Sequence, residues 1–161
     1  YRAYMQLSSF SAKIVIFNQI NKSEIPEQGI FYDGQIYDAY TFVADLLRSA
    51  KSRIILIDNY IDDTVLTLLN KRENNVSATI YTDRISRNLQ LDIERHNTQY
   101  PIITVRTYRM GHDRFLIIDD KIYHIGASIK DLGKKLFGFS LMHELSVSEL
   151  LNRIDMRLIN D

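Results

Sequence analysis

The spacing of apolar residues along this chain alternates between a helical and a strand-like pattern, and these changes mark out its elements. From Tyr37 to Lys51 apolar side chains recur every three or four positions, which predicts an amphipathic helix. Arg53–Asp58 is a continuous apolar run, which is typical of a strand covered on both faces. We predict further strands at Ile30–Tyr32, Val76–Thr82, Ile102–Tyr108, Phe115–Ile118, Ile122–Ile125 and Phe137–Met142, and further helices at Thr64–Arg72, Ser86–Asn97 and His143–Ile159.

The beginning of the chain has a different pattern. Apolar residues three or four positions apart predict an amphipathic helix over Tyr4–Asn21, although Ile14–Phe17 is equally consistent with a strand. Lys22–Gly29 contains Pro and Gly and predicts a linker. We therefore expect residues 1–29 to be a helix and linker at the end of an upstream region, and residues 30–161 to form one domain. Since the first residue is not Met, we interpret the chain as a fragment of a longer protein.

Helices that alternate with buried strands predict the α/β class. We expect an α/β/α sandwich around a mixed, mostly parallel central sheet. The early strands would run parallel. Phe115–Ile118 and Ile122–Ile125 would pair antiparallel through the tight turn Asp119-Asp120-Lys121.

Residues that carry chemistry concentrate between His112 and Asp131. Alternation along a strand places His112 and Arg114 on one face. An imidazole can act as nucleophile or proton carrier, and a guanidinium offers a fixed fork of donors that fits phosphate oxygens. Asp119 closes the strand, and Gly126-Ala127-Ser128 follows the next strand, where the backbone can approach a ligand closely. This stretch is a candidate phosphate site.

The overall charge favours no class of partner, because 20 Lys and Arg balance 20 Asp and Glu. The region Tyr100–Gly138 is locally basic, with seven Lys or Arg against four Asp. Lys130, Lys134 and Lys135 are candidate contacts to a nucleic-acid backbone, and a solvated loop explains them equally well. The ten Tyr residues are interpreted as edge-of-core residues rather than as a platform for stacking bases.

The chain contains no cysteine, which excludes disulfides and thiolate metal sites and fits a reducing compartment, so we expect a cytoplasmic protein. The four His residues are not spaced as a metal cluster, and we expect neither a metal nor another cofactor. No apolar run approaches the roughly 18 residues of a membrane-spanning helix, and we expect no membrane partner.

The segment His112-x-Arg114-x-x-x-x-Asp119, followed after six intervening residues by Gly126-Ala127-Ser128, resembles the HxKxxxxD motif and small-residue turn of the phospholipase D superfamily. The helix, strand and Asn59-Tyr60-Ile61 segment upstream resemble the opening of phospholipase D-like domains, so the resemblance covers roughly Ile30–His143. The chain also resembles the C-terminal phospholipase D-like modules of bacterial and phage antirepressor-like DNA-binding proteins.

The resemblance implies a metal-independent, two-step phosphodiester transfer through a phosphohistidine. It implies that His112 is the nucleophile or the acid, that Arg114 stands at the lysine position, and that Asp119 is the motif aspartate. Ser128 would be a polar partner of the site. Because the chain carries one copy of the motif, the family implies a composite site in a homodimer that receives one His from each protomer.

Two functions stay open at this point. One is a phosphodiesterase of the nuclease type, with DNA or RNA preferred over lipid because no amphipathic membrane element is evident. The other is a non-catalytic binding and dimerisation module of a DNA-binding regulatory protein. In the family the turn often carries Ser and Asn where this chain has Ala127 and Ile129, and Arg114 replaces Lys. A structural role for the motif residues is a further alternative, and His124 is interpreted as a core histidine.

Overall fold

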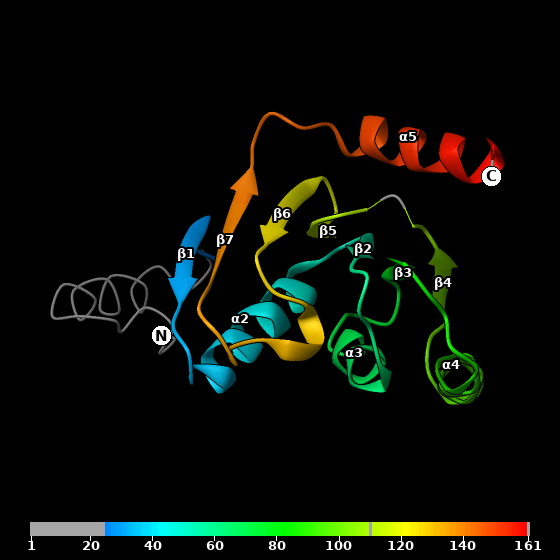
Figure 1. The fold of residues 1–161 in the computed structure, drawn as a ribbon, viewed down its shortest axis with the longest axis horizontal. Coiled ribbons are helices and arrows are strands. Elements are labelled where there is room, and N and C mark those ends of the chain that lie inside the picture. The colour runs from blue at the N-terminus through cyan, green and yellow to red at the C-terminus, as the bar shows by residue number, and fades with distance from the viewer. Residues whose placement is uncertain (1–24, 110, 161) are drawn as a thin grey trace, which may run out of the picture.

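The computed structural model describes residues 25–109 and 111–160. Within these residues the chain alternates between strands and helices before the hairpin and ends in a helix (Figure 1). The elements are β1 (Gln28–Phe31), α2 (Ile36–Ser49), β2 (Arg53–Ile57), α3 (Asp63–Leu69), β3 (Ser77–Thr82), α4 (Arg87–Gln99), β4 (Ile103–Thr107), β5 (Arg114–Ile118), β6 (Lys121–Ile125), the 3₁₀ helix η2 (Ile129–Asp131), β7 (Phe137–Met142) and α5 (Val147–Asn160).

One seven-stranded sheet runs through the described residues in the order β1-β7-β6-β5-β2-β3-β4. The pairs β2–β3 and β3–β4 are parallel, as predicted for the early strands. The pairs β1–β7, β7–β6, β6–β5 and β5–β2 are antiparallel. The α/β class and the mixed sheet are therefore confirmed, but the prediction of a mostly parallel sheet is wrong. The tight turn between β5 and β6 allows only an antiparallel pair, since a parallel return needs a longer crossover.

The two faces of the sheet carry separate apolar clusters. In β2, Ile54 and Leu56 join a cluster with buried residues of α2, α3 and α4, whereas Ile55 and Ile57 join a second cluster with Val147 and Ile154 of α5. Alternate strand residues point to opposite faces, which explains why Ile54–Ile57 of β2 are all apolar. Accordingly, α2, α3 and α4 lie on one side of the sheet and α5 on the other (Figure 1).

Polar residues define several helix starts. The side chain of Asp62 accepts a hydrogen bond from the Thr64 N–H at the start of α3, and Ser86 accepts one from the Leu89 N–H at the start of α4. The last helix was predicted to begin at His143 and instead begins at Val147. Ser146 explains the later start, because its hydroxyl accepts a hydrogen bond from the Glu149 N–H at 3.3 Å and so caps the helix there.

The N-terminal predictions are only partly testable. The predicted helix over Tyr4–Asn21 lies outside the described residues. Gln28 and Gly29, which were expected in the linker, are the first two residues of β1, and this strand ends at Phe31 rather than Tyr32. Pairing with β7 explains the difference, because Gln28 lies opposite Ser140 in the sheet. A polar side chain such as that of Gln28 does not predict a strand from the sequence.

Candidate functional site

A buried carboxylate lies at the centre of the candidate site. Asp58 follows β2 directly and has no exposed surface. Its oxygens accept hydrogen bonds from the Ser128 hydroxyl at 2.9 Å, the Ile129 N–H at 2.8 Å and the Tyr60 N–H at 3.0 Å. Burial raises the pKa of Asp58, while these donors and the charge of Arg114 act in the opposite direction. The carboxylate thus ties the end of β2 to the turn after β6.

Arg114 stands beside this network. It is the first residue of β5, and β5 runs antiparallel to β2, so the start of one strand lies next to the end of the other. The guanidinium carbon lies 6.0 Å from the centroid of the Tyr60 ring. Tyr60 is 58% exposed, although its backbone N–H and carbonyl are both held by the Asp58 network. Arg114 therefore contacts the Tyr60 ring and is still partly exposed at the surface.

His112 lies in the loop before β5 rather than on the strand itself. Its side chain is fully exposed, and its Nδ1 lies 3.4 Å from a carboxylate oxygen of Asp113. The other carboxylate oxygen of Asp113 lies 3.4 Å from Nε2 of His124. The hydrogen bond with His112, together with the neighbouring His124, lowers the pKa of Asp113 below its usual range. His124 was interpreted as a core histidine, but its side chain is 33% exposed and faces this carboxylate.

The loop that carries His112 is fastened to the loop after β2. The side-chain amide of Asn59 donates a hydrogen bond to the carbonyl of Gly111 at 2.9 Å. Asn59 and Gly111 are far apart in the sequence, and the β2–β5 pairing brings them together. As a result, the loop after β2 and the loop before β5 adjoin at one end of these two inner strands. They and the adjoining strand ends carry Asp58, Tyr60, His112 and Arg114.

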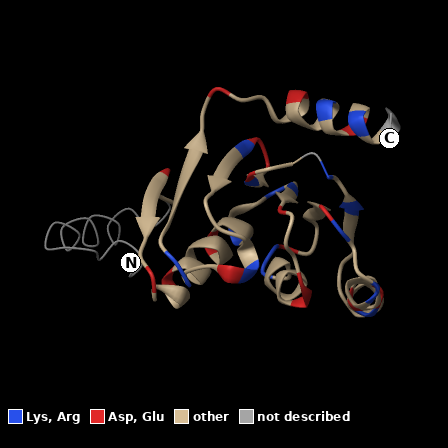
Figure 2. Cartoon of the chain, in the orientation of Figure 1, with Lys and Arg blue, Asp and Glu red and all other residues tan. Residues whose placement is uncertain are grey.

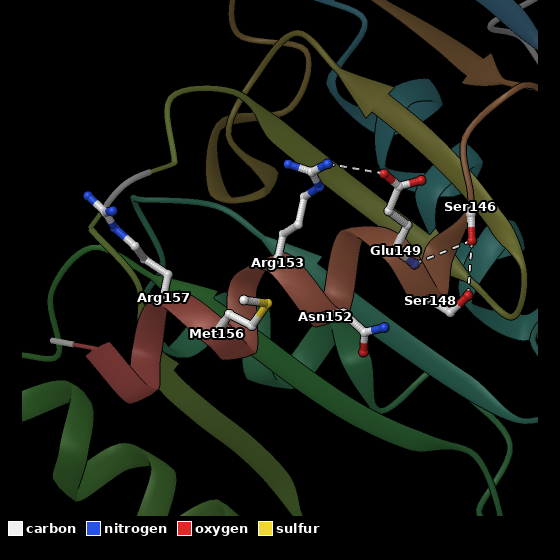
Figure 3. Close-up of a pocket in the computed structure, with 7 residues that line it drawn as sticks. All are labelled: Ser146, Ser148, Glu149, Asn152, Arg153, Met156 and Arg157. Carbon is white, nitrogen blue, oxygen red and sulfur yellow. Dashed lines mark hydrogen bonds and ion pairs between the residues drawn. The ribbon is translucent and has the colours of Figure 1, made fainter.

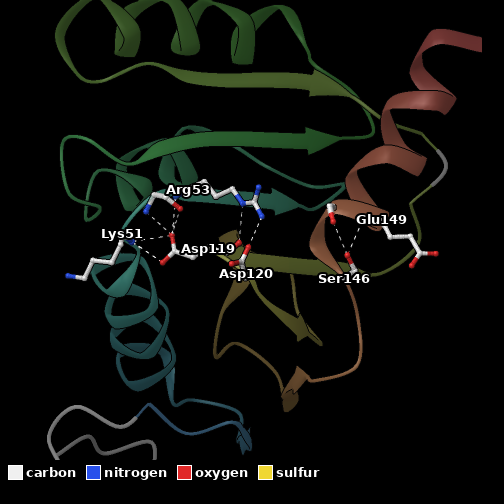
Figure 4. A network of polar contacts seen from close by, with 8 residues as sticks. Lys51, Arg53, Asp119, Asp120, Ser146 and Glu149 are labelled. Atoms are coloured by element: carbon white, nitrogen blue, oxygen red, sulfur yellow. Dashed lines mark hydrogen bonds and ion pairs between the residues drawn. The ribbon is translucent and has the colours of Figure 1, made fainter.

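Asp119 lies at the opposite end of β5. Asp113 and the five residues of β5 separate it from His112, and the strand alone spans roughly 15 Å. Its carboxylate accepts hydrogen bonds from the backbone N–H groups of Lys51, Ser52 and Arg53 (Figure 4). Burial raises the pKa of Asp119, but these hydrogen bonds outweigh it and bring the pKa to about 2. The structure therefore does not bring Asp119 together with His112 and Arg114.

The remaining predicted residues lie in or beside η2. Ser128 is buried, and the one proton of its hydroxyl is shared between Asp58 and the carbonyl of Tyr60. Lys130 lies within η2, and its ammonium group is 3.1 Å from a carboxylate oxygen of Asp131. Ser128 thus joins the Asp58 network, while Lys130 is held in an ion pair with its neighbour.

The wider surface offers no uniform charge. Lys and Arg are interspersed with Asp and Glu along α4 and α5 (Figure 2). An open hollow follows the outer side of α5, and its lining residues include Glu149, Arg153 and Arg157 (Figure 3). None of the predicted site residues lines this hollow. No group of three or more His, Cys, Asp or Glu residues in the described part of the chain is arranged to hold a metal ion.

Sequence reasoning missed the roles of Asp58, Tyr60 and Asp113. Asp58 had a usable signal, because it is the first charged residue after a strand that is buried on both faces. Tyr60 lies in the Asn59-Tyr60-Ile61 segment of the resemblance, which assigns it no role. Asp113 had no signal, since a loop aspartate is common on any protein surface.

No protein-family model matches this sequence, and no curated protein matches it. Similar solved structures do exist. Phosphatidylserine synthase of Haemophilus influenzae Rd KW20 aligns with a TM-score of 0.56 and 17% identity over 80% of this chain and 36% of that one. NucT from Helicobacter pylori aligns with a TM-score of 0.51 and 10% identity over 81% of this chain and 91% of that one.

These two neighbours support a phospholipase D-like fold. A third is TrmBL2, an archaeal chromatin protein whose structure shows a novel mode of DNA binding. It aligns with a TM-score of 0.54 and 13% identity over 94% of this chain. This chain spans 60% of the length of TrmBL2. At 10–17% identity, the likeness to these three structures concerns the fold alone.

Proposed function

We propose that this phospholipase D-like domain is a phosphodiesterase of the nuclease type whose site is shared by two copies of the chain. The single observation that carries the proposal is the fully exposed side chain of His112, followed two residues later by Arg114, whose guanidinium lies over the Tyr60 ring. The imidazole can reach a ligand on the surface, and the guanidinium can hold a phosphate next to it. The motif resemblance and the fold of the two phospholipase D-like neighbours support the same chemistry.

In the first step, a ring nitrogen of His112 attacks phosphorus and forms an N–P bond while the P–O bond to the leaving group breaks. The leaving oxygen takes a proton from the partner subunit's His112. In the second step, that neutral imidazole removes a proton from water, the water oxygen attacks phosphorus, and the N–P bond breaks. Arg114 stabilises the charge that develops on the phosphoryl oxygens in both steps.

A second copy is needed because one chain supplies one motif. His112 is exposed in the single chain, so a partner related by a two-fold axis can bring its own His112 to the same phosphate. The acid and the nucleophile are then the same residue from two protomers. Asp119 acts indirectly, by holding the start of β2. Lys130 acts indirectly as well, through its positive charge near the site.

The proposal is tested by incubating the 161-residue chain with an activated phosphodiester and with DNA and RNA oligonucleotides. Samples are quenched at alkaline pH, where a phosphohistidine is stable, and weighed intact by mass spectrometry. We expect a covalent adduct and turnover that are both absent in His112→Ala. His143→Ala is the matched control, because His143 is an exposed histidine paired with Glu27 away from the site. Turnover that survives in His112→Ala would contradict the proposal.

The shared site has its own test. An excess of the His112→Ala chain, mixed with the wild-type chain, forms mixed dimers that hold one histidine. We expect this excess to suppress wild-type turnover, whereas an excess of His143→Ala does not. Sedimentation of the wild-type chain measures the dimer directly. Undiminished turnover in the mixtures would show that each chain acts alone.

One observation favours the second candidate, a non-catalytic binding and dimerisation module of a DNA-binding regulatory protein. Ser128 and Ile129 are buried and make their hydrogen bonds to Asp58, so the turn after β6 contributes to the protein interior rather than to a ligand. The extent of the match with TrmBL2 agrees with such a role. A dimer that binds oligonucleotides in a salt-dependent way without adduct or turnover identifies this second function.

A further inference from the structure

Tyr60 combines an exposed ring with an immobilised backbone. The residue is 58% exposed, whereas Asp58, two positions earlier, is completely buried. The Tyr60 N–H donates to Asp58 at 3.0 Å, and its carbonyl accepts from the Ser128 hydroxyl at 2.7 Å. Here the ring is presented to solvent from a fixed position, which reduces the entropy lost when a ligand packs against it.

The Arg114 guanidinium and the Tyr60 ring together give this surface a cationic group and an aromatic group. The Arg114 guanidinium lies 6.0 Å from the ring centroid, within the range of a cation–π contact. A flat aromatic surface suits a planar, weakly polar group, and the adjacent guanidinium suits an anion. A nucleotide carries both parts, because its base is planar and its phosphate is negative. A lipid phosphodiester offers the anion without the planar group.

We propose that the Tyr60 ring stacks on a nucleobase of single-stranded DNA or RNA whose phosphodiester is held at Arg114. The inference rests on the proposed function, since it names the substrate class of that same site. An unpaired strand is required because bases in a duplex are already stacked on each other and present only their edges. Stacking is tolerant of sequence, since every base has a π face. The site therefore selects single-stranded nucleic acid without reading its sequence.

The loop geometry agrees with this arrangement. The side-chain amide of Asn59 donates a hydrogen bond to the carbonyl of Gly111. This hydrogen bond therefore joins the loop that carries Tyr60 to the loop that carries His112. A base seated on Tyr60 positions the adjoining phosphate next to Arg114 and within the surroundings of His112.

The test compares two labelled oligonucleotides of equal length, one with its bases and one in which the central nucleotides are abasic, by fluorescence anisotropy. Both carry the same phosphates, so they differ only in the bases available for stacking. We expect the wild-type chain to bind the normal strand more tightly. Tyr60→Ala and Tyr60→Leu should each weaken binding of the normal strand about 5- to 150-fold. Both should leave binding of the abasic strand unchanged, and Tyr60→Phe should behave like the wild type.

Matched variants separate stacking from other effects. Tyr37→Ala removes an even more exposed tyrosine, 75% exposed on α2, and should change neither affinity. Arg114→Ala should weaken both strands alike, because it removes a phosphate contact. Equal losses for the two strands in Tyr60→Ala, or equal wild-type affinity for both, would overturn the inference and leave the proposed function standing. Failure of the wild type to bind either strand would overturn both.

Discussion

The carboxylate of Asp119 accepts two hydrogen bonds from Ser52, one from its backbone N–H at 2.7 Å and one from its hydroxyl at 2.9 Å. The two residues are 67 positions apart and meet because β5 pairs with β2. Asp119 itself adopts a positive φ of 54°. Asp119 therefore joins the start of β2 to the β5–β6 turn (Figure 4).

The first prediction concerns this closure. Asp119→Asn keeps a residue that tolerates a positive φ but removes the charge that strengthens the hydrogen bonds from the backbone. We expect the free energy of unfolding at pH 7 to fall by about 1 to 2 kcal/mol, as measured by urea denaturation. Asp120→Asn is the control, because the neighbouring Asp120 side chain is 96% exposed and makes only a surface ion pair with Arg53. Equal losses in the two variants would contradict the role assigned to Asp119.

The same variant has a signature in its pH dependence. The pKa of Asp119 is lowered from 3.8 to about 2 in the folded protein. A lowered folded-state pKa stabilises the protein above the unfolded-state pKa, and this contribution is lost as the pH falls through the folded-state value. The difference in stability between the wild type and Asp119→Asn should therefore be full above about pH 4 and shrink toward pH 2. A difference that stays constant over this range would show that the carboxylate charge is not involved.

A second prediction addresses the buried network at the site. Ser128→Ala removes one of the donors to Asp58 and leaves the carboxylate buried with fewer hydrogen bonds. We expect the free energy of unfolding to fall by about 1 to 3 kcal/mol. Ser77→Ala, on the exposed start of β3, should change it by less than about 0.5 kcal/mol. If Ser128→Ala is as stable as the wild type, the network does not hold the loop that carries Tyr60.

A third prediction uses two glycines that are joined by a hydrogen bond from the Gly34 N–H to the Gly133 carbonyl. Both have positive φ, 87° and 76°. A Cβ at Gly34 would meet nothing within 4 Å, whereas a Cβ at Gly133 would lie 2.5 Å from Cα of Ile36. Gly34→Ala should cost about 1 to 2 kcal/mol of backbone strain. Gly133→Ala should cost roughly 1 to 3 kcal/mol more, because the backbone of α2 must move. Thermal melting of the two variants measures the order, and equal costs would contradict it.

The sequence by itself determined the elements and their faces. The continuous apolar run in β2 predicted a strand buried on both sides, and Ile54 and Ile55 indeed belong to clusters on opposite faces. Such local patterns are readable because each strand or helix repeats its own period, whatever surrounds it. The bounds of the edge strand β1 and the start of α5 were not predicted correctly from these patterns. They depend on pairing with β7 and on capping by Ser146, which involve a few polar contacts.

Only the tertiary structure decided which of the polar residues belong together. The motif places His112, Arg114 and Asp119 in one short segment, but an extended strand carries its two ends apart, so Asp119 serves the start of β2 instead. Asp58 and Ser128 are 70 positions apart and share a hydrogen bond. A sequence pattern reports neighbours along the chain, whereas a site consists of neighbours in space, and the β2–β5 pairing supplies the second kind of proximity.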